Sequence, residues 1–310
     1  EQPHNVLNKE VTISDLVFMI GPRINAAGRL EKASDSVRLL IADRKEHAEK
    51  LAAGINNLNA KRRELDNEIT KEALSMIERD TRLRDAKSTV LFNENWQKGV
   101  IGIVASRLTD SYYRPTIVLT RSNNLITGSA RSIRSFDIYD AIDNCSDLLE
   151  HFGGHKYAAG LSLKPENLPE FMRRFEEYVS ANIENEELVP ELNVDLEINF
   201  SDITPKFVRV LKQFAPFGPG NMSPVFLTKN VVDAGTSRSV GDKKHLKLTI
   251  FQQNAPDNIF AGIAFQKGHI YNRVHSREPF DMCYCIEKNF WQGKTNLQLN
   301  VKDIKFSEEY

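Results

Sequence analysis

One long stretch of helical periodicity constrains the fold more than any other feature of the sequence. Between about Ser34 and Arg82, apolar residues recur at spacings of three, four and seven, as on one face of a helix. The stretch contains no proline and one glycine, and eleven Lys/Arg balance ten Asp/Glu between Asp43 and Lys87. A helix of ~40 residues at ~1.5 Å per residue is about 60 Å long, longer than a small domain. We therefore expect a helix that connects two bodies, with its narrow apolar stripe packed against neighbouring elements rather than in a dimeric coiled coil.

The composition is that of an ordinary soluble protein. A length of 310 residues suits two domains, and 41% hydrophobic and 27% charged residues are typical values. No apolar run approaches the roughly 20 residues of a membrane span, so no membrane association is expected. Three cysteines without a CxxC pattern favour neither a disulfide framework nor a zinc site, which fits a reducing cytoplasm. The chain starts with Glu1 rather than Met, so we expect it to be part of a longer protein.

The near-neutral net charge of −1 hides local differences. Residues 96–134 carry six Lys/Arg and one acid, and residues 200–252 carry eight Lys/Arg and three acids. Between them, residues 137–197 carry fifteen acids and four Lys/Arg. The two basic segments could hold phosphates, although random variation of the surface remains an alternative.

Two different patterns follow the long helix. Strands at "STVLFN" and "PTIVLT" flank a helix at "GVIGIVASRLTDSYY", and a second helix is expected from about Ile138 to His151. The strand "LSLKP" and the amphipathic helix "LPEFMRRFEEYVSANI" complete an α/β domain with helices covering a sheet. An acidic segment over 183–192 is the expected linker. Five or six short strands over the following ~115 residues suit a small closed barrel such as an OB-fold.

The motif "GPRINAAGRL", at the end of an expected irregular lead-in, is the first candidate phosphate site. It places Arg23 and Arg29 around Asn25 in a predicted loop with small residues. Arg can grip a phosphate with two parallel hydrogen bonds, and small side chains allow a close approach. Two arginines that bridge to acids on a neighbouring helix are the alternative.

The motif "TGSARSIRSF" is the second candidate. Gly128 permits a tight turn, Ser129 and Ser132 supply hydroxyls, and Arg131 adds positive charge. Such groups converging on one turn predict a phosphate nest, with a purely structural turn as the alternative. There is no P-loop or GxGxxG, so the motif is not a mononucleotide fingerprint.

The motif "HFGGHKYAAG" places His151 and His155 four residues apart, the spacing of a helical metal pair. Gly153 and Gly154 stand between them, and glycine costs about 1 kcal/mol inside a helix. We therefore predict that a helix ends near Phe152 and that the two histidines point in different directions. His155 would be the phosphate contact of a glycine-lined loop and His151 structural, and a buried packing turn is the alternative.

The barrel region offers a candidate single-strand groove. Cations run into one strand and aromatics stand at a turn, and aromatic stacking contributes about 1–3 kcal/mol per base in such grooves. Aromatics in small barrels also form the core, which is the alternative. The candidate groove residues are Lys243, His245, Lys247, Phe290 and Trp291. No compact cluster of carboxylates and histidines is apparent, so no metal site is predicted in this chain.

These motifs, in this order, resemble the C-terminal half of the RecJ family, the single-stranded-DNA-specific exonucleases of the DHH phosphoesterase superfamily. The matching pieces include "GPRINAAGRL", "GVIGIVASRL", "GSARS", "FGGHKYAAG", "PFGPGN" and "LQLNVKDI". The resemblance implies a DHHA1 domain at 83–182 and an OB-fold at 190–310. The helix at 34–82 would join the DHHA1 domain to a catalytic DHH lobe that residues 1–33 border.

The resemblance also implies roles for residues. Arg23 would face the substrate backbone, Ser129 and Arg131 would hold the 5′-end phosphate, and Gly153, Gly154 and His155 would lie beside the scissile phosphate. The divalent metal, Mn or Mg, would be bound in the DHH lobe and not by this chain. One departure is that the family commonly has Trp-His where this chain has Trp96-Gln97, so that histidine's role does not carry over.

The expected function is therefore that of the DNA-binding half of a 5′-to-3′ single-stranded-DNA exonuclease, inactive by itself. The expected partners are single-stranded DNA with a 5′ end, the DHH lobe in cis, and a single-strand-binding protein or helicase. A phosphodiesterase for small oligonucleotides or cyclic dinucleotides is the first alternative, and the appended barrel argues against it. A nuclease-dead DNA-binding scaffold is the second, which the metal ligands of the DHH lobe would decide.

Overall fold

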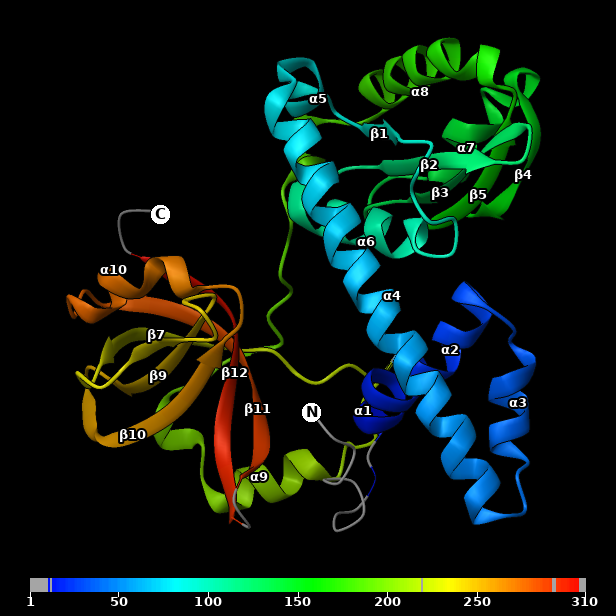
Figure 1. Cartoon of the computed structure of the whole chain (residues 1–310). Coiled ribbons are helices and arrows are strands. Elements are labelled where there is room, and N and C mark those ends of the chain that lie inside the picture. Colours follow the sequence, from blue (N-terminus) through cyan, green and yellow to red (C-terminus); the bar gives the residue numbers. More distant parts are fainter. Residues whose placement is uncertain (1–10, 12, 219, 292–293, 307–310) are drawn as a thin grey trace. The chain divides into compact units, whose positions relative to one another are not determined.

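The structure is a computed structural model that describes residues 11, 13–218, 220–291 and 294–306. The chain forms two compact units, which join between Glu191 and Leu192 (Figure 1). No helix of the described residues is long and apolar enough to cross a membrane.

The first unit begins with helices, so the prediction of an irregular lead-in over residues 1–33 is wrong for the part that is described. These elements are α1 (Ile13–Asp15), the π-helical turn η2 (Leu16–Ile20) and α2 (Gly21–Leu30). The "GPRINAAGRL" motif forms α2 rather than a loop. Pro22 lies in its first turn, where the missing N–H loses no hydrogen bond, and Ala26 and Ala27 are fully buried. The small residues serve helix packing.

The single helix predicted over 34–82 is broken into three. Helices α3 (Ser34–Leu40), α4 (Lys45–Arg79) and α5 (Thr81–Asp85) follow one another. The first break ends at Arg44, whose backbone is extended (φ −112°, ψ 128°), and the second is at the extended Asp80 (φ −110°, ψ 109°). The Ser36 hydroxyl donates to the Ile24 carbonyl at 2.8 Å and ties α3 back to α2. The turn lets α2 and α3 pack on the first half of α4, which a continuous helix would leave uncovered. With 35 residues, α4 is still about 52 Å long.

The centre of the first unit is a five-stranded sheet in the order β1-β2-β3-β5-β4. Strands β1 and β2 are parallel and the other neighbours are antiparallel. The strands are β1 (Thr89–Phe92), β2 (Thr116–Ser122), β3 (Leu125–Arg131), β4 (Leu149–His155) and β5 (Ala158–Leu163). The helices of this domain are α6 (Ile101–Tyr112), α7 (Ile138–Asp143) and α8 (Leu168–Asn182), with 3₁₀ turns η3 (Ser146–Leu148), η4 (Pro165–Asn167) and η5 (Asn185–Leu188).

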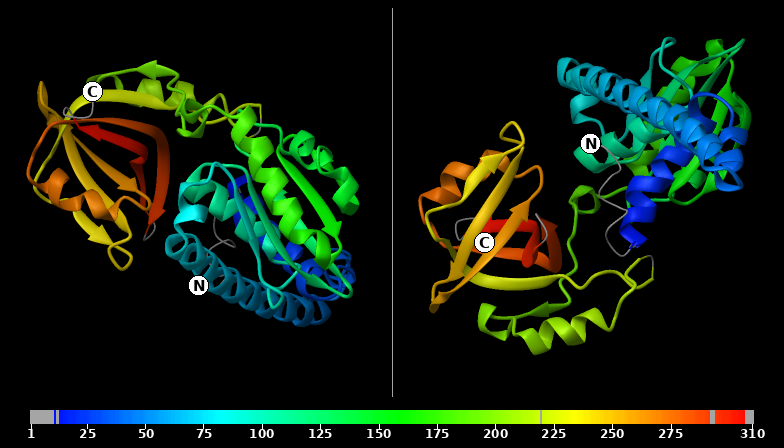
Figure 2. Two further views of the ribbon diagram at one scale, coloured as in Figure 1. Left: turned by 90° about the horizontal axis from the view of Figure 1, so that it is seen from above. Right: turned by 60° about the horizontal axis from the view of Figure 1, so that its bottom comes forward.

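Helices cover the two faces of this sheet unequally (Figures 1 and 2). Helices α7 and α8 bury one face, where Phe171 and Phe175 pack with strand residues such as Ile117 and Leu163. On the other face, α6 and α4 cover the β1–β2 side through contacts such as Val104 with Val118. The β5–β4 side of this second face keeps exposed residues, and we call it the open face.

Two local predictions near the open face are wrong. The helix expected to reach His151 ends at Asp143, and β4 begins at Leu149. The "TGSARS" segment, expected as a turn, is strand β3. In β3 every second residue is buried, which is the period of a strand with one face in the core, and Gly128 occupies one of these core positions.

The second unit is a closed barrel. Strands β7 (Phe226–Asp233), β9 (His245–Gln252), β10 (Ala255–Ala264), β11 (Phe280–Trp291) and β12 (Lys294–Phe306) form its wall. The sheet order β7-β11-β12-β10-β9 is closed by pairing of β9 with β7, and only β10–β12 is parallel within this wall. This is the five-stranded topology of an OB-fold, with α10 (Tyr271–His275) between its third and fourth strands. The remaining elements are β6 (Leu196–Glu197), η6 (Phe200–Asp202), α9 (Pro205–Lys212), β8 (Arg238–Val240) and η7 (Gly268–Ile270).

Candidate nucleic-acid interface

The strand register brings three of the sequence motifs together on the open face. Antiparallel partners share a face, so each residue of β3 lies in a row with one residue of β5 and one of β4. One row is Arg131, Ala158 and His155, the next is Ser129, Gly160 and Gly153, and the third is Thr127, Ser162 and His151. A row spans about 10 Å from β3 to β4. The "GSARS" and "FGGHKYAAG" motifs therefore build one surface.

Arg131 is anchored in a fixed orientation at the covered edge of this face. Its Nε donates to Ser106 Oγ at 3.1 Å, and its Nη1 donates to Ser129 Oγ at 3.1 Å and to the Ala130 carbonyl at 2.7 Å. Nη2 and the Ser129 hydroxyl proton have no acceptor among the described residues. Three donors therefore remain for a ligand, namely the two N–H groups of Nη2 and the Ser129 hydroxyl. The hydrogen bonds from Nε and Nη1 already fix the orientation of the guanidinium.

The electrostatics at Arg131 favour an anion. Burial lowers the pKa of Arg131 from its ordinary value, and the positive charge of Arg29 lowers it further. No ion pair with a carboxylate is formed by either arginine within the described residues. An arginine remains protonated at neutral pH, so the two cations lie near each other without a close ion pair, and Asp66 acts on Arg29 only at longer range. A bound phosphate would supply the missing negative charge.

Two glycines at the start of α6 let this segment approach Arg131 and Arg29 closely. A Cβ on Gly102 would lie 2.9 Å from Ser129 Oγ and 3.3 Å from Arg131 Nη2. A Cβ on Gly99 would lie 1.9 Å from the Arg29 carbonyl oxygen, and Arg29 Nη1 donates to the Gly99 carbonyl at 3.1 Å. The absence of these side chains therefore brings α2, α6 and β3 together at one place.

The motif glycines have different roles. A Cβ on Gly128 would lie 2.4 Å from Leu119 Cδ2 in the core, so this glycine serves packing and its predicted role in a ligand turn is wrong. Gly154 has φ +156°, and a Cβ there would lie 2.4 Å from the Ala158 carbonyl oxygen, which makes it a requirement of the β4–β5 hairpin. Gly153 and Gly160 are paired on the open face, and neither would bring a Cβ closer than 3.9 Å to a neighbour. Exposed glycines in strands are typical of places where a ligand approaches the backbone.

The two histidines of the motif lie on the same face of β4, so the prediction that they point in different directions is wrong. Four strand residues separate them by about 13 Å, whereas two nitrogens that share one metal at ~2.1 Å each lie within about 4 Å. His155 Nδ1 accepts a hydrogen bond from the Tyr157 amide at 3.4 Å, and both side chains are exposed. Among the described residues, no group of three His, Cys, Asp or Glu could hold a metal ion.

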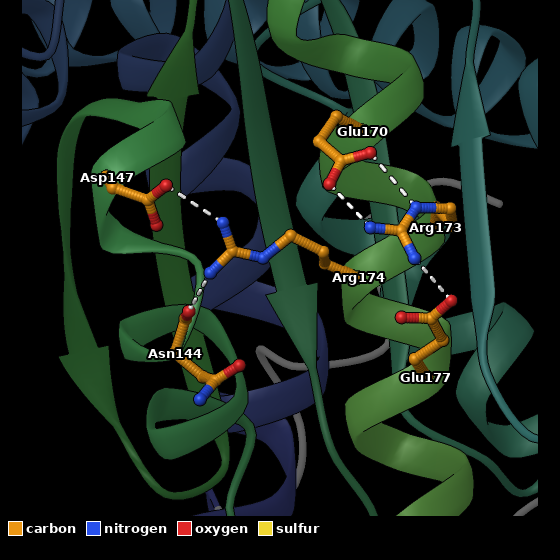
Figure 3. Close-up of polar contacts among 6 residues, drawn as sticks. All are labelled: Asn144, Asp147, Glu170, Arg173, Arg174 and Glu177. Carbon is orange, nitrogen blue, oxygen red and sulfur yellow. Dashed lines mark hydrogen bonds and ion pairs between the residues drawn. The ribbon is translucent and has the colours of Figure 1, made fainter.

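Helix α8 fixes the start of β4 from the opposite side of the sheet. Arg174 donates to Asp147 Oδ2 at 2.8 Å and to the Asn144 carbonyl at 2.6 Å, as Figure 3 shows. The Asn167 amide donates to the Leu148 carbonyl at 2.9 Å. These bonds hold the η3 turn directly before Leu149, and thus set the position of the strand that carries the motif.

The other residues predicted to bind phosphate make no hydrogen bond or ion pair with the Ser129–Arg131 pair among the described residues. The Ser132 hydroxyl donates to the Phe136 carbonyl at 2.8 Å and stabilises the turn after β3. Arg23 donates to Asn56 Oδ1 at 2.8 Å and to the Met19 carbonyl at 2.6 Å, so it joins α2 to α4. Asn25 is exposed on α2. No described contact links Arg23 or Asn25 to the Ser129–Arg131 pair, whereas Arg29 of the same motif lies near it.

The barrel presents a second surface on the outside of β9 and β10, the strands that bind oligonucleotides in many OB-folds. His245 and Lys247 point outward, since they alternate along β9 with the buried Leu246 and Leu248. The His245 ring lies 5.3 Å from the exposed Phe265 ring, and its Nδ1 accepts from the Gln266 amide at 3.1 Å. A half-buried histidine ring against an exposed phenylalanine ring, with a cation beside them, is typical of a surface that binds single strands.

Two further predicted groove positions lie at the ends of strands. Lys243 stands in the β8–β9 turn with φ +64°, next to Asp242 with φ +54°, so the chain reverses here. Phe290 and Trp291 end β11, and their side chains lie outside the described residues. Arg238 lies opposite Lys247 in the register of β8 and β9, so it adds a cation to the same surface.

Several residues of the two surfaces were not found from the sequence. Gly102 lies in the first turn of α6, and a glycine within the predicted helical stretch was a signal for a close approach. Ser106, one helical turn later, and Phe265 carried no such signal, because their roles depend on contacts between distant segments. Gln97, where the resemblance implied a histidine, is exposed four residues before the start of α6, and its carbonyl accepts from the Val100 amide.

Comparison with known proteins agrees with this organisation. Residues 85–181 match the family model of the DHHA1 domain, and residues 194–303 match that of the RecJ OB domain. The single-stranded-DNA-specific exonuclease RecJ of Bacillus subtilis is 34% identical over 94% of this chain and 37% of its own length. The RecJ of Haemophilus influenzae is 32% identical over 97% of this chain and 53% of its own length.

A solved structure gives the same result. The crystal structure of Thermus thermophilus RecJ in complex with Mn²⁺ matches 97% of this chain and 43% of its own chain, with a TM-score of 0.81 and 26% identity. The chain thus spans about half, or less, of the length of these relatives. The DHHA1 domain, the RecJ OB domain and the full-chain similarity place the chain in the RecJ family.

Proposed function

We propose that this chain is the DNA-binding part of a RecJ-type exonuclease that degrades single-stranded DNA from its 5′ end. The observation that carries the proposal is the uncompensated, pre-oriented Arg131 beside the Ser129 hydroxyl. A 5′-terminal phosphate carries more charge and more free oxygens than a phosphodiester within the strand, so it suits the converging donors of Ser129 and Arg131 and a second arginine. Holding the 5′ end would fix the polarity of degradation.

The other parts of the open face support this assignment. The exposed backbone of Gly153 and Gly160 would let the sugar–phosphate chain lie close to the sheet. His155, in the same row as Arg131, would contact the next phosphate. The β9–β10 surface of the barrel would bind the strand by stacking and by charge, without reading its sequence.

The chemistry of hydrolysis is assigned to none of the described residues. RecJ of Thermus thermophilus has been solved with Mn²⁺ and with Mg²⁺, and a divalent metal could activate water and stabilise the charge on the phosphate. The described residues do not fit that role, because they form no metal-binding group. We propose that a DHH lobe in cis holds the metal, and that the present chain grips and orients the DNA.

The protein partners and the compartment are further parts of the proposal. A single-strand-binding protein or a helicase would supply the single strand. Cys145, Cys283 and Cys285 are free thiols, which is consistent with a reducing cytoplasm. The RecJ OB domain argues against a dinucleotide phosphodiesterase, because a dinucleotide offers no further strand for a second binding domain.

Binding of fluorescent 12-nucleotide single strands to the 310-residue chain tests the proposal. We expect tighter binding of a 5′-phosphorylated strand than of a 5′-hydroxyl strand or a duplex, and log K should fall with log salt by about 0.7 per phosphate neutralised. Equal affinity for phosphorylated and hydroxyl ends contradicts the assignment of Ser129 and Arg131. Metal-dependent digestion by this purified chain contradicts the assignment of the metal site to another lobe.

A further inference from the structure

An open pocket lies on the open face beside the Ser129–Arg131 pair. Its lining includes Thr127, Gly160, His151, Ser162, Lys98 and Asn123. Its volume is about 450 Å³, within the range of roughly 300–1,000 Å³ that is usual for small-molecule sites. We call it the β3 pocket. Thr127 lies two residues before Ser129 in β3, so the pocket begins about 7 Å from the proposed phosphate position.

The polar side chains of the β3 pocket are largely unused by the protein. His151, Ser162 and Asn123 take part in no described side-chain hydrogen bond or ion pair. Thr127 Oγ1 makes only a 3.4 Å contact with the Leu161 carbonyl, and Lys98 Nζ a 3.5 Å contact with Ser122 Oγ. Side chains from β3, β4, β5 and two loops thus converge on one space without satisfying one another.

The chemistry of these groups indicates the kind of ligand. An imidazole, two hydroxyls and a carboxamide can each donate and accept hydrogen bonds. Only Lys98 carries a permanent charge, in contrast to the two arginines at the neighbouring phosphate position. The pocket therefore suits a neutral ligand with both donors and acceptors rather than a second phosphate.

We propose that the β3 pocket binds the nucleoside of the 5′-terminal nucleotide whose phosphate Ser129 and Arg131 hold. This inference rests on the proposed function and adds to it the position of the terminal base and sugar. Gly160 is common to both sites, since it lies opposite Ser129 and also lines the pocket. A residue with a side chain there would separate the phosphate from the pocket. Groups that both donate and accept would pair with any base edge, so the pocket would hold the terminal nucleotide without selecting its sequence.

The test compares 5′-phosphorylated trinucleotides that have either a base or an abasic residue at the 5′ end. Binding to the ¹⁵N-labelled 310-residue chain is followed through the amide signals of Gly160 and Ser162. We expect the abasic ligand to bind about five- to tenfold more weakly, because it loses one or two net hydrogen bonds. The double variant His151→Ala/Ser162→Ala should bind both ligands equally, while keeping the preference for a 5′-phosphate over a 5′-hydroxyl.

A matched control is His47→Ala/Ser135→Ala, which removes an exposed histidine and an exposed serine outside the pocket. This control should retain the difference between the two trinucleotides. Equal binding of the base-containing and abasic ligands by the unmodified chain, with the 5′-phosphate preference intact, overturns the pocket and leaves the proposed function standing. Loss of the 5′-phosphate preference in the unmodified chain overturns the proposed function itself. Retention of the abasic discrimination in the double variant also overturns the pocket.

Discussion

Two sets of arginines in the first unit differ in how their charge is compensated. Arg62 and Arg107 share the carboxylate of the fully buried Asp66, at 3.6 Å and 2.8 Å. Arg29 and Arg131 have no ion pair with an acid among the described residues. The first set forms ion pairs within the protein and joins α4 to α6, whereas the second set would gain its ion pair from the anion that we propose to bind there. Charge compensation therefore separates structural arginines from ligand-binding ones, although the sequence presents all four alike.

Asp66→Ala should have the largest effect on stability. The substitution leaves two arginines facing each other at the α4–α6 interface without their counter-ion. Removal of one partner from a buried pair costs about 3–5 kcal/mol, and we expect about 2–3 kcal/mol here because Arg107 is 45% exposed. Urea unfolding of the variant measures this loss. If the free energy of unfolding changes by less than about 0.5 kcal/mol, as is usual for a substitution at the surface, the distinction between the two arginine sets is lost.

The pH dependence of the same site provides a control. Burial raises the pKa of Asp66 above its ordinary value, against the opposing effect of Arg107 and Arg62. The folded state then binds a proton more readily than the unfolded chain, so the stabilisation from protonation is present below the ordinary carboxyl pKa. It is lost as the pH rises through the folded pKa. Asp66→Asn, which resembles the protonated form, should not show this loss of stability with rising pH. If the free energy of unfolding of the unmodified chain instead increases as the pH rises through this range because of Asp66, the direction of the pKa shift is contradicted.

Arg131→Ala should act on recognition rather than on stability. Hydrogen bonds to charged groups contribute about 1.5–3 kcal/mol, so the preference for a 5′-phosphate should fall by roughly 10- to 100-fold. Arg107→Ala is the matched control, because it removes a guanidinium that is already paired with Asp66. It should lower the unfolding free energy and leave the 5′-phosphate preference intact. If both variants lose the preference equally, compensation does not identify the ligand-binding set.

Glycines on the two faces of the sheet provide a third comparison. Gly128→Ala should lower the unfolding free energy by about 1–3 kcal/mol, because its Cβ would lie 2.4 Å from Leu119 Cδ2. Gly153→Ala meets nothing within 4 Å, so it should leave stability unchanged or improved and instead weaken binding of single-stranded DNA. Thermal unfolding and DNA titration of both variants separate the two roles. A Gly153→Ala chain that binds DNA normally would show that the exposed backbone is not a ligand surface.

Sequence patterns predicted the local elements best where a period repeats. The strand–helix–strand around "GVIGIVASRL" and helix α8 have long, regular patterns and were found. Strand β3 was predicted as a turn, and β4 as the end of a helix followed by a loop, because glycines at 128, 153 and 154 favour turns and helix ends when only local conformation is considered. Here Gly128 and Gly154 are required by close contacts across the sheet, whereas Gly153 faces open space. A single sequence does not reveal which strand will lie opposite them.

The same limit applies to the candidate site. Ser129, Arg131 and His155 were selected for their side-chain chemistry, and the strand register then places them in neighbouring rows. The compensation of Arg107 by Asp66, and the absence of such compensation at Arg131, depend on how α4 and α6 pack. His151 was predicted to be structural, but it lines an exposed pocket whose other residues come from distant parts of the sequence.

Lys247→Ala should have the smallest effect and a different character. Lys247 is exposed on β9 and no described contact orients it, so it would act as a mobile charge near phosphates. Its loss should weaken single-strand binding only about two- to threefold, equally for 5′-phosphate and 5′-hydroxyl ends, and should reduce the salt slope by about 0.7. Titrations at several salt concentrations measure both quantities. The opposite result, in which Lys247→Ala alters the preference for a 5′-phosphate and Arg131→Ala alters only the salt slope, would assign binding of the 5′ end to the barrel. An anchored guanidinium should discriminate between ligands and a free ammonium should only attract them, because orientation is fixed before binding in one case and not in the other.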